Sequence, residues 1–269
     1  MNTLALAAIF RNEAPYLKEW IEFHLEMGVS RFYLFDNLSQ DASVQTLQPY
    51  IEKNIVELTP WPLTHSDILE WNEVQCLAYE RALRKAQGKS KWLALLDTDE
   101  FLFPAQNESL EHILSDFEPF GGVGVNWQLY GTSSVQIPEN GLLIETLCQK
   151  LPETAGANHH IKSIIRPERA LSCDCPHFVH YKPGYFQVNM DRTPFEGLLS
   201  PAVSIERLRI NHYILRDEHY FHTQKIPRLQ SWWGRPASFW EEKYSGMNQV
   251  FDPAIVRFAP SVKKRMGMV

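Results

Sequence analysis

A short apolar run that ends in three carboxylates constrains this chain more than any other stretch. Residues 91–104 read KWLALLDTDEFLFP. The run from Trp92 to Leu96 is too short for a core helix, but its length suits a strand buried on both faces. Asp97, Asp99 and Glu100 follow directly, before the sequence turns apolar again. We therefore predict a buried strand with an acidic cluster at its carboxyl end.

The position of Asp97 and Asp99 favours a metal site. In open α/β sheets ligands bind beyond the carboxyl ends of the strands, and two aspartates one residue apart can hold a hard cation beside a phosphate. An Asp-x-Asp sequence is common by chance, and the alternatives here are a solvated turn or a helix cap. The buried strand in front of the two aspartates is the observation that favours metal.

The composition is that of an ordinary globular protein and argues against a nucleic-acid partner. The chain has 269 residues, of which 44% are hydrophobic and 22% charged, and its formal net charge is -6. It contains no block rich in Lys and Arg. Because nucleic-acid binding depends on clustered cations that neutralise phosphates, we expect no such partner. A nucleotide is still compatible, since a metal ion can carry the positive charge locally.

No targeting segment is evident. The apolar run from Leu4 to Phe10 lacks a basic region before it and a small-residue cleavage site after it, so we interpret it as a first strand. No stretch approaches the roughly 18 consecutive apolar residues of a membrane span. We expect a cytoplasmic protein, at most peripheral to the inner face of the membrane. The cations at 263–265 are predicted to complement the end of a helix, with a membrane-surface patch as the alternative.

The four cysteines do not form a disulfide framework. Cys76 and Cys148 are predicted to be buried thiols. The remaining two lie in CDCPHFVH, whose candidate zinc ligands are Cys173, Cys175, His177 and His180. Zinc sites usually draw ligands from two separated segments, and four ligands within eight residues would struggle to surround one ion. The alternative is that the cysteines pack inward and the histidines serve elsewhere.

Strands and helices alternate through the first half of the chain. Buried strands are predicted over residues 3–10, 31–35, 55–58, 92–96 and 122–127. Apolar residues at helical spacing predict helices between them, and Asp67 can cap the longest one. This alternation predicts a parallel sheet with right-handed crossovers. Neither the dinucleotide-binding glycine fingerprint nor a P-loop follows any strand.

The second half is richer in His, Pro and aromatic residues, and its periodicity is weaker. Further strands are predicted over residues 161–165, 178–181 and 208–214. Near the end, Asp252 is a predicted helix cap with Pro253 at the first helical position. Pro260 is expected to kink that helix.

Several separated stretches resemble glycosyltransferases of the A fold, in the group of family 92 and family 2-like enzymes. The matching pieces are IFRNEAPYLKEWIEFHLEMGVSRFYLFDNLSQD, EVQCLAYERAL, WLALLDTDEFLFP, VNWQLYGTSS, HHIKSIIRP and LRINHY, which together span about residues 4–215. The usual Lys-Ser pair after the Asn-His-Tyr element is Arg216-Asp217 in this chain. The resemblance implies a Rossmann-like, mostly parallel mixed sheet flanked by helices, with an irregular C-terminal half. It further implies a nucleotide-sugar-binding half over residues 1–130 and an acceptor-binding half over residues 131–269, both within one compact catalytic domain.

The implied activity is transfer of a sugar from a nucleotide-diphosphate donor, most often a UDP-sugar, to an acceptor hydroxyl. The enzyme would be an inverting transferase of the hexosyltransferase type that depends on Mn²⁺ or Mg²⁺. Its acceptor would be a glycan or glycolipid, as in the synthesis of cell-surface polysaccharides.

The resemblance assigns the metal to three residues. Asp99 would bind the ion directly, and Asp97 would bind the ion or the ribose. His212, in INHY, would supply a further ligand from the second half of the chain. The alternative for His212 is a structural hydrogen bond.

Four further residues are candidates for the donor pocket. Asn12, Glu13 and Asp36 would line the uracil and ribose, and Lys162 would contact the diphosphate. The alternatives are a helix cap for Asn12, a turn for Asp36 and an ordinary surface position for Lys162.

An inverting transfer needs a general base, which the sequence does not single out. Glu100 is the first candidate, followed by Asp191 and Glu196 in the stretch NMDRTPFEG. Trp127 and Tyr130 could stack against a sugar ring, with a place in the core as the alternative.

Two other functions are compatible with these residues. One is a non-catalytic nucleotide-sugar or carbohydrate binding module on the same fold. The other is a nucleotidyltransferase, which would use similar carboxylates and a metal but release pyrophosphate instead of a nucleoside diphosphate.

Overall fold

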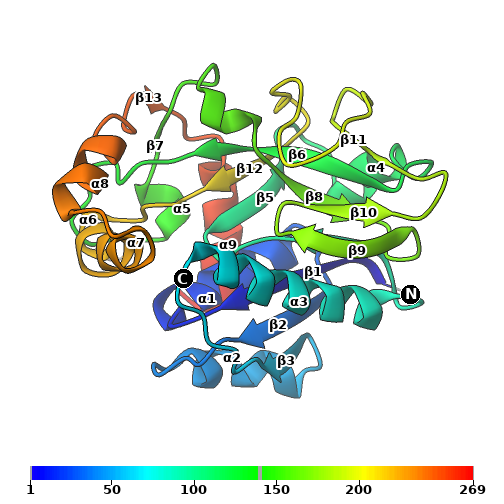
Figure 1. Ribbon diagram of the computed structural model, residues 1–269, viewed down its shortest axis with the longest axis horizontal. Coiled ribbons are helices and arrows are strands. Elements are labelled where there is room, and N and C mark those ends of the chain that lie inside the picture. The colour runs from blue at the N-terminus through cyan, green and yellow to red at the C-terminus, as the bar shows by residue number, and fades with distance from the viewer. Residues whose placement is uncertain (1, 139–140, 269) are drawn as a thin grey trace.

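One mixed sheet runs through the protein and carries strands from both halves of the chain (Figure 1). The computed structural model describes residues 2–138 and 141–268. The strands of this sheet are β1 (Asn2–Phe10), β2 (Arg31–Asp36), β3 (Val56–Pro60), β4 (Ser90–Leu95), β5 (Glu100–Pro104), β6 (Gly122–Leu129), β8 (Ile161–Ile165), β11 (Gln187–Val188) and β12 (Leu208–His212). Each strand predicted in the first half is present.

The order along the sheet is β3-β2-β1-β4-β8-β6-β12-β5, with β11 paired to β6. The first four strands are parallel to one another, as predicted. Strand β8 is antiparallel to β4 and β6, whereas β12 is parallel to β6 and antiparallel to β5. The mostly parallel mixed sheet implied by the resemblance is therefore confirmed.

The sheet must curl, because β4 and β5 are close in sequence but far apart in strand order. Three strands lie between them, so a flat sheet would separate them by about 19 Å. The link from Leu95 to Glu100 spans at most about 17 Å when fully extended, and it contains a turn. Because the sheet curls, this segment, called the acidic link below, lies at the carboxyl edge of the sheet where the two halves of the sheet meet.

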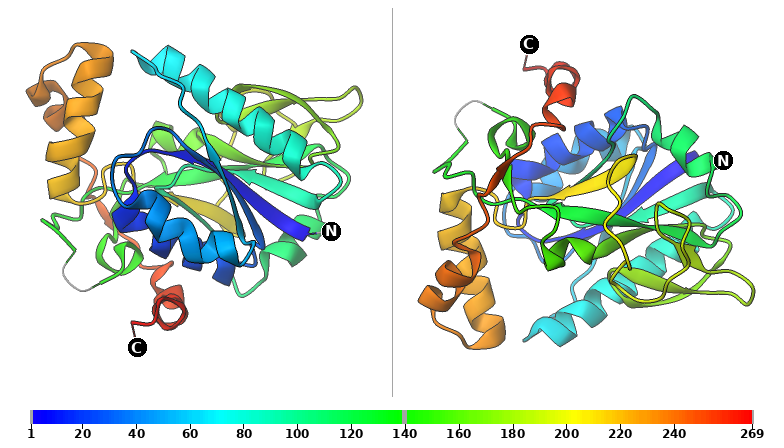
Figure 2. Two further views of the ribbon diagram at one scale, coloured as in Figure 1. Left: turned by 90° about the horizontal axis from the view of Figure 1, so that it is seen from below. Right: turned by 90° about the horizontal axis from the view of Figure 1, so that it is seen from above.

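Helices cover both faces of the sheet (Figure 2). The larger helices are α1 (Ala14–Glu26), α2 (Ser43–Glu52), α3 (Ile68–Ala86), α7 (Ile226–Trp233), α8 (Ala237–Tyr244) and α9 (Ala259–Met266). Helices α1 and α9 pack with one apolar cluster, and α3 packs with a second cluster on the other face beside the hairpin of β9 (Ala170–Cys175) and β10 (Phe178–Tyr181). The predicted cap of α3 is confirmed, since the Asp67 carboxylate accepts hydrogen bonds from two backbone N–H groups of its first turn.

Smaller elements complete the chain. They are α4 (Leu110–Ser115), α5 (Leu143–Thr146), β7 (Gln149–Lys150), η1 (Gly156–His159), α6 (Glu218–Tyr220), the π-helical turn η2 (Phe221–Lys225), β13 (Val250–Phe251) and η3 (Val256–Phe258). Figure 1 shows α6, α7 and α8 grouped at one end of the molecule, away from the β9–β10 hairpin. Within the described ranges no helix is long and apolar enough to cross a membrane.

The prediction for the C-terminal helix is wrong at its start. The Asp252 carboxylate accepts bonds from Arg209 at 2.9 Å and from the backbone N–H of Ala254 at 3.0 Å, but it caps no helix. Helix α9 begins only at Ala259. Pro260 lies in its first turn, where a missing N–H removes no helical bond, so this proline starts the helix and does not kink it.

Two of the three cations at the end of α9 are engaged in ion pairs. Lys263 pairs with Glu145 at 2.7 Å, and Arg265 pairs with Glu22 at 2.9 Å. These contacts tie α9 to α1 and α5.

Helix α1 covers the outer edge of β5 with two buried side chains. Trp20 Nε1 donates to the carbonyl of Glu100 at 2.8 Å, and the N–H of Leu102 donates to His24 Nε2 at 3.2 Å. His24 Nδ1 lies 2.8 Å from the carbonyl of Trp20 and therefore carries the proton. Burial lowers the pKa of His24 to about 3, so the ring is neutral in the folded state. These bonds satisfy an edge that would otherwise be unpaired.

His24 should make the protein sensitive to acid. The unfolded imidazole binds a proton below its ordinary pKa of 6.5, whereas the buried ring does not. The neutral His24 ring therefore stabilises the folded state above that pH. As the pH falls, the free energy of unfolding decreases by at most about 1.4 kcal/mol per pH unit because of this residue. In chemical denaturation between pH 7 and 5, His24→Gln should show a shallower decline in unfolding free energy than the wild type. If the unfolding free energies of the two proteins declined in parallel over this pH range, His24 would not be the source of the acid sensitivity.

Candidate active site

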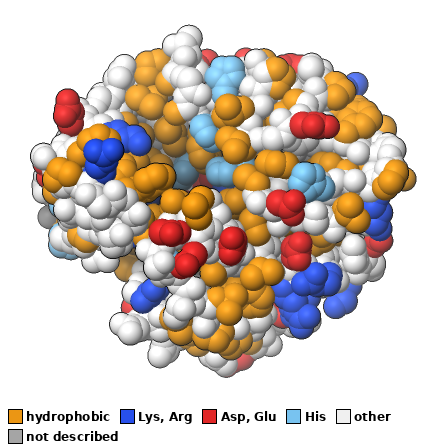
Figure 3. Space-filling view, in the orientation of Figure 1, with side chains coloured by type: hydrophobic (Ala, Val, Ile, Leu, Met, Phe, Trp, Pro, Cys, Tyr) orange, Lys and Arg blue, Asp and Glu red, His pale blue; other side chains and the backbone are white. Residues whose placement is uncertain are grey.

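A cleft of about 790 Å³ lies beyond the carboxyl ends of β1 and β4. The first half supplies the residues after β1, the acidic link and the first turns of α3, and the second half supplies β8, β12 and the segment from Arg216 to α7. Histidine side chains gather around the hollow in the middle of the face drawn in Figure 3. The site therefore requires both halves of the chain.

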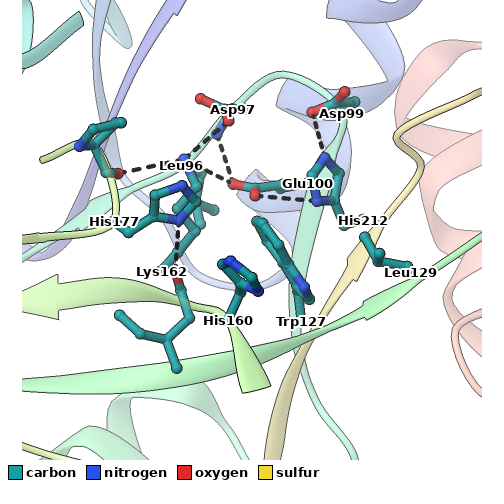
Figure 4. A network of polar contacts seen from close by, with 12 residues as sticks. Leu96, Asp97, Asp99, Glu100, Trp127, Leu129, His160, Lys162, His177 and His212 are labelled. Carbon is teal, nitrogen blue, oxygen red and sulfur yellow. Dashed lines mark hydrogen bonds and ion pairs between the residues drawn. The ribbon is translucent and has the colours of Figure 1, made fainter. Parts of the chain in front are cut away.

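Asp97 is held by three neighbours at the floor of the cleft, of which Figure 4 labels Lys162. Lys162 Nζ lies 2.9 Å from Oδ2, while Gln75 and the hydroxyl of Tyr79 donate to Oδ1 at 2.5 and 3.2 Å. Burial raises the pKa of Asp97, but the Lys162 charge outweighs it and the pKa lies below its ordinary value. Lys162 is 1% exposed, so its interpretation as a surface lysine is wrong.

Glu100 lies beneath the cleft and is completely buried. Its Oε2 accepts a bond from the N–H of Asp97 at 2.8 Å and lies 3.6 Å from Lys162 Nζ. Burial raises the pKa of Glu100 well above its ordinary value. Its side chain supports the acidic link from below and does not line the cleft.

Asp99 points into the cleft beside His212. Its Oδ1 lies 3.5 Å from His212 Nε2, and His212 Nδ1 lies 3.6 Å from Oε1 of Glu100. Burial raises the pKa of Asp99, but the neighbouring imidazole of His212 lowers it. The lowering is larger, so the pKa of Asp99 is well below its ordinary value. His212 Nδ1 and Glu100 Oε1 are buried without a hydrogen-bond partner among the described residues. Asp99 and His212, predicted from distant segments, are thus brought together.

Asp99 and His212 suit a divalent cation better than Asp97 does. No group of three or more His, Cys, Asp or Glu side chains in residues 2–138 and 141–268 is arranged to hold a metal ion. Two protein ligands are enough for an ion that takes its remaining ligands from substrate phosphates and water. Asp97 would first have to give up its bonds to Lys162 or Gln75.

The donor-pocket candidates separate into two groups. Asn12 lines the cleft, and its Oδ1 accepts from the N–H of Gln40 at 2.7 Å across the loop after β2. Glu13 is buried beside it and is ion-paired to Arg216. Asp36 does not line the cleft, because its carboxylate accepts from the N–H of Ser39 at 3.1 Å and forms a turn. Asn12 does not cap α1, whose N-cap position is Glu13 and has no side-chain bond.

The other two candidate bases lie outside the cleft. Asp191 and Glu196 are exposed in the loop after β11, and Asp191 accepts a hydrogen bond from Ser204. Trp127 does line the cleft. Tyr130 is completely buried in the core, so it cannot stack on a bound sugar.

A basic wall opposite the acidic link was not anticipated from the sequence. It consists of Arg216, Lys225 and Arg228, all of which line the cleft. Arg216 is 1% exposed, and its guanidinium lies 3.6 Å from the ring centre of Tyr16. Burial lowers the pKa of Lys225 to about 8. The only signal in the sequence was the replacement of the family's Lys-Ser by Arg216-Asp217.

Several buried donors of the basic wall lack a hydrogen-bond partner among the described residues. They are Nε and Nη1 of Arg216 and Nε of Arg228. Buried guanidinium groups are normally satisfied. The Arg216 guanidinium instead lies against the rings of Tyr16 and Tyr220, with centre distances of 3.6 and 4.8 Å.

Aromatic side chains close the mouth of the cleft. Trp71 at the start of α3 stacks near Trp232 of α7, with ring centres 6.3 Å apart, and His65 packs against both. The wall carrying α7 is thereby joined to the wall carrying α3.

The four side chains of CDCPHFVH do not converge on one point. His177 lines the cleft and its Nδ1 lies 3.0 Å from the carbonyl of Ile161, whereas His180 pairs with Asp174 at 3.0 Å. Cys173 packs inward and is 4% exposed. The predicted burial of Cys76 and Cys148 is confirmed.

Known relatives match most of this chain. A protein described as belonging to glycosyltransferase family 92 in Ricinus communis is 25% identical over 221 residues, which cover 79% of this chain and 35% of that protein. A second, from Oryza sativa subsp. japonica, is 26% identical over 196 residues, covering 70% and 31%. The chain thus spans about a third of the length of these relatives. Among solved structures, S. aureus TarS in complex with UDP aligns with a TM-score of 0.41 and 11% identity over 61% of this chain and 47% of that one.

The family model described as glycosyltransferase family 92 matches residues 3–249. That range contains the acidic link, His212 and the basic wall. Because the match extends over nearly the whole chain, this protein belongs to glycosyltransferase family 92.

Proposed function

We propose that this chain transfers a sugar from a nucleotide-diphosphate donor, with UDP-sugars as the first candidates, to an acceptor hydroxyl with inversion. One observation carries the proposal. The same cleft is lined by Asp99 and His212 and by the cations Arg216, Lys225 and Arg228. A diphosphate in the cleft would meet both a candidate metal site and these cations.

The basic wall would stabilise the leaving diphosphate. Negative charge builds up on the diphosphate as the bond to the sugar breaks, and fixed donors in a partly buried site stabilise that charge with little reorganisation. Arg216 and Arg228, which both line the cleft, would supply such donors. Arg216 is also held in place by its ion pair with Glu13 and by the rings of Tyr16 and Tyr220.

Asp99 and His212 would hold Mn²⁺ or Mg²⁺. When bound, the ion supplies Lewis-acid stabilisation of the diphosphate oxygens. Lys162 and Glu100 keep the acidic link in place by binding the carboxylate and the N–H of Asp97. Asp97 can then orient the ribose through the edge of its carboxylate that faces the cleft.

The nucleoside would lie near Asn12, at the end of β1. The acceptor, a glycan or glycolipid hydroxyl, would enter from the side formed by residues 131–269. This assignment follows the family resemblance together with the division of the lining residues between the two halves.

Thermal unfolding with a panel of UDP- and GDP-sugars, with and without Mn²⁺, tests the proposal most directly. We expect at least one of these donors to raise the melting temperature of the protein. With Mn²⁺ present, that donor should also be cleaved, releasing UDP or GDP. Donor binding by the wild type without release would favour a non-catalytic binding module. Release of pyrophosphate would favour a nucleotidyltransferase.

Asp99→Ala should lower the rate of UDP release by at least about 100-fold, because it removes a metal ligand beside the diphosphate. Its circular dichroism spectrum and melting temperature should stay near those of the wild type, since Asp99 is not part of the core. Glu52→Ala, an exposed carboxylate at the end of α2, is the matched control and should leave the rate unchanged. Full activity in Asp99→Ala would remove the acidic link from the mechanism.

Affinity for UDP should fall with rising pH because of Lys225. Its pKa in the free protein is about 8, so the ammonium is charged below that pH and neutral above it. In metal-free calorimetric titrations the UDP affinity should fall above pH 8 by up to about tenfold per pH unit. Lys225→Arg stays charged and should show a flat profile over the same range. A pH dependence that persists unchanged in Lys225→Arg would refute the assignment.

A further inference from the structure

Among the described residues, every carboxylate that lines the cleft is already in an ion pair or faces a histidine. The acidic lining residues are Glu13, Asp97 and Asp99. Their respective partners are Arg216, Lys162 and His212. Each carboxylate would have to break an ion pair before it could accept a proton, and the three carboxylates predicted as bases lie outside the cleft lining.

His177 presents an uncommitted proton acceptor to the cleft. Its Nδ1 lies 3.0 Å from the carbonyl of Ile161, and only an N–H can approach a carbonyl oxygen so closely. The proton is therefore on Nδ1, and Nε2 carries the lone pair. The ring is half-buried and lines the cleft.

The backbone around His177 is fixed by β8. The hydroxyl of Ser163 donates to the carbonyl of His177 at 2.9 Å, and Lys162 Nζ lies 3.4 Å from the carbonyl of Pro176. With the bond from Nδ1 to Ile161, three contacts hold one imidazole against a single strand. Such preorganisation is what a group that must meet a reacting atom requires.

Trp127 lies between His177 and the metal side of the cleft. In Figure 4 the indole of Trp127 lies between the rings of His177 and His212. The ring centres are 5.3 Å apart for Trp127 and His177 and 4.6 Å apart for Trp127 and His212. In an inverting transfer the attacking and leaving oxygens lie on opposite faces of the anomeric carbon, so the base and the diphosphate site must be separated in this way.

The other histidines near the cleft are placed differently. His160 stacks on Trp127 and does not line the cleft, and His212 faces Asp99 and Glu100. His65 packs against Trp71 and Trp232, and its Nδ1 is buried.

We propose that Nε2 of His177 accepts the proton of the acceptor hydroxyl during sugar transfer, an assignment that rests on the proposed function above. The acceptor oxygen forms a bond to the anomeric carbon as the bond from that carbon to the diphosphate oxygen breaks. The bonding electron pair leaves with the diphosphate, and the hydroxyl proton moves to Nε2. His177 then returns its proton to solvent after the products leave.

The charges around His177 fit this role. In the free protein, burial and then the charge of Lys162 lower the pKa of His177 to about 3, so the ring is neutral and ready to accept. His160 lowers this pKa further, while Asp97 raises it. A bound diphosphate would offset the charge of Lys162, so the basicity of Nε2 rises when the donor is in place.

His177→Gln and His177→Ala test the proposal, with His180→Ala as the matched control on the same hairpin. Water serves as the acceptor, and UDP release from UDP-glucose, UDP-galactose and UDP-N-acetylglucosamine is measured with Mn²⁺. We expect kcat to fall by about 100-fold or more in both His177 variants. Affinity for UDP should change by less than about twofold, because His177 is not a donor-binding group, and His180→Ala should behave as the wild type.

Two further readouts separate a base from a structural residue. Added imidazole should restore part of the rate in His177→Ala. The wild-type rate should fall at acidic pH as Nε2 becomes protonated, and this fall should be absent in His177→Gln. Retention of UDP release in His177→Gln, or loss of UDP affinity in step with rate, would overturn the assignment of His177 alone. Absence of UDP release by the wild type from all three donors would overturn the proposed function itself.

Discussion

The buried ammonium of Lys162 is the contact on which the architecture of the site depends. It lies 2.9 Å from a carboxylate oxygen of Asp97 and 3.6 Å from one of Glu100; Lys162 and Glu100 are buried, whereas Asp97 is partly exposed in the cleft. The Lys162 charge keeps the pKa of Asp97 below its ordinary value, and removal of one member of a buried ionic group typically costs about 3–5 kcal/mol. Lys162 is supplied by β8, which lies next to β4 in the sheet. The pairing of these strands therefore delivers the cation to the acidic link.

The acidic link owes its shape to the curled sheet. Strand β4 ends and β5 begins within a few residues, yet β8, β6 and β12 lie between them in the sheet. Helix α1 fixes the far side of the link through the bonds of Trp20 and His24 to β5. Glu100 is thereby drawn beneath the cleft while Asp99 faces into it. Adjacent acidic residues thus lie in different environments, Glu100 buried beneath the link and Asp99 at the surface of the cleft.

The second half of the chain converts this edge of the sheet into a cleft. His212 arrives at the end of β12, directly opposite Glu100 in the antiparallel pair with β5. The segment after β12 then places Arg216 against Glu13 and carries Lys225 and Arg228 across the opening. Among the described residues, Nε and Nη1 of Arg216 and Nε of Arg228 are buried without a hydrogen-bond partner.

The sequence by itself determined the alternation of strands and helices, the Asp67 cap and the address of the acidic link, because these depend on local periodicity and on the chemistry of neighbouring residues. It also suggested Asp99 and His212 as partners through the family resemblance. Only the tertiary structure decided that Lys162 neutralises Asp97, that Glu100 is buried, that Asp36 turns away and that His177 faces the cleft. Each of these outcomes depends on contacts between segments far apart in sequence: Lys162 and Asp97 are 65 positions apart, and Arg216 and Glu13 are 203 apart. Local patterns carry no information about such pairings, because strand order and the curl of the sheet, not neighbouring residues, determine which charges meet.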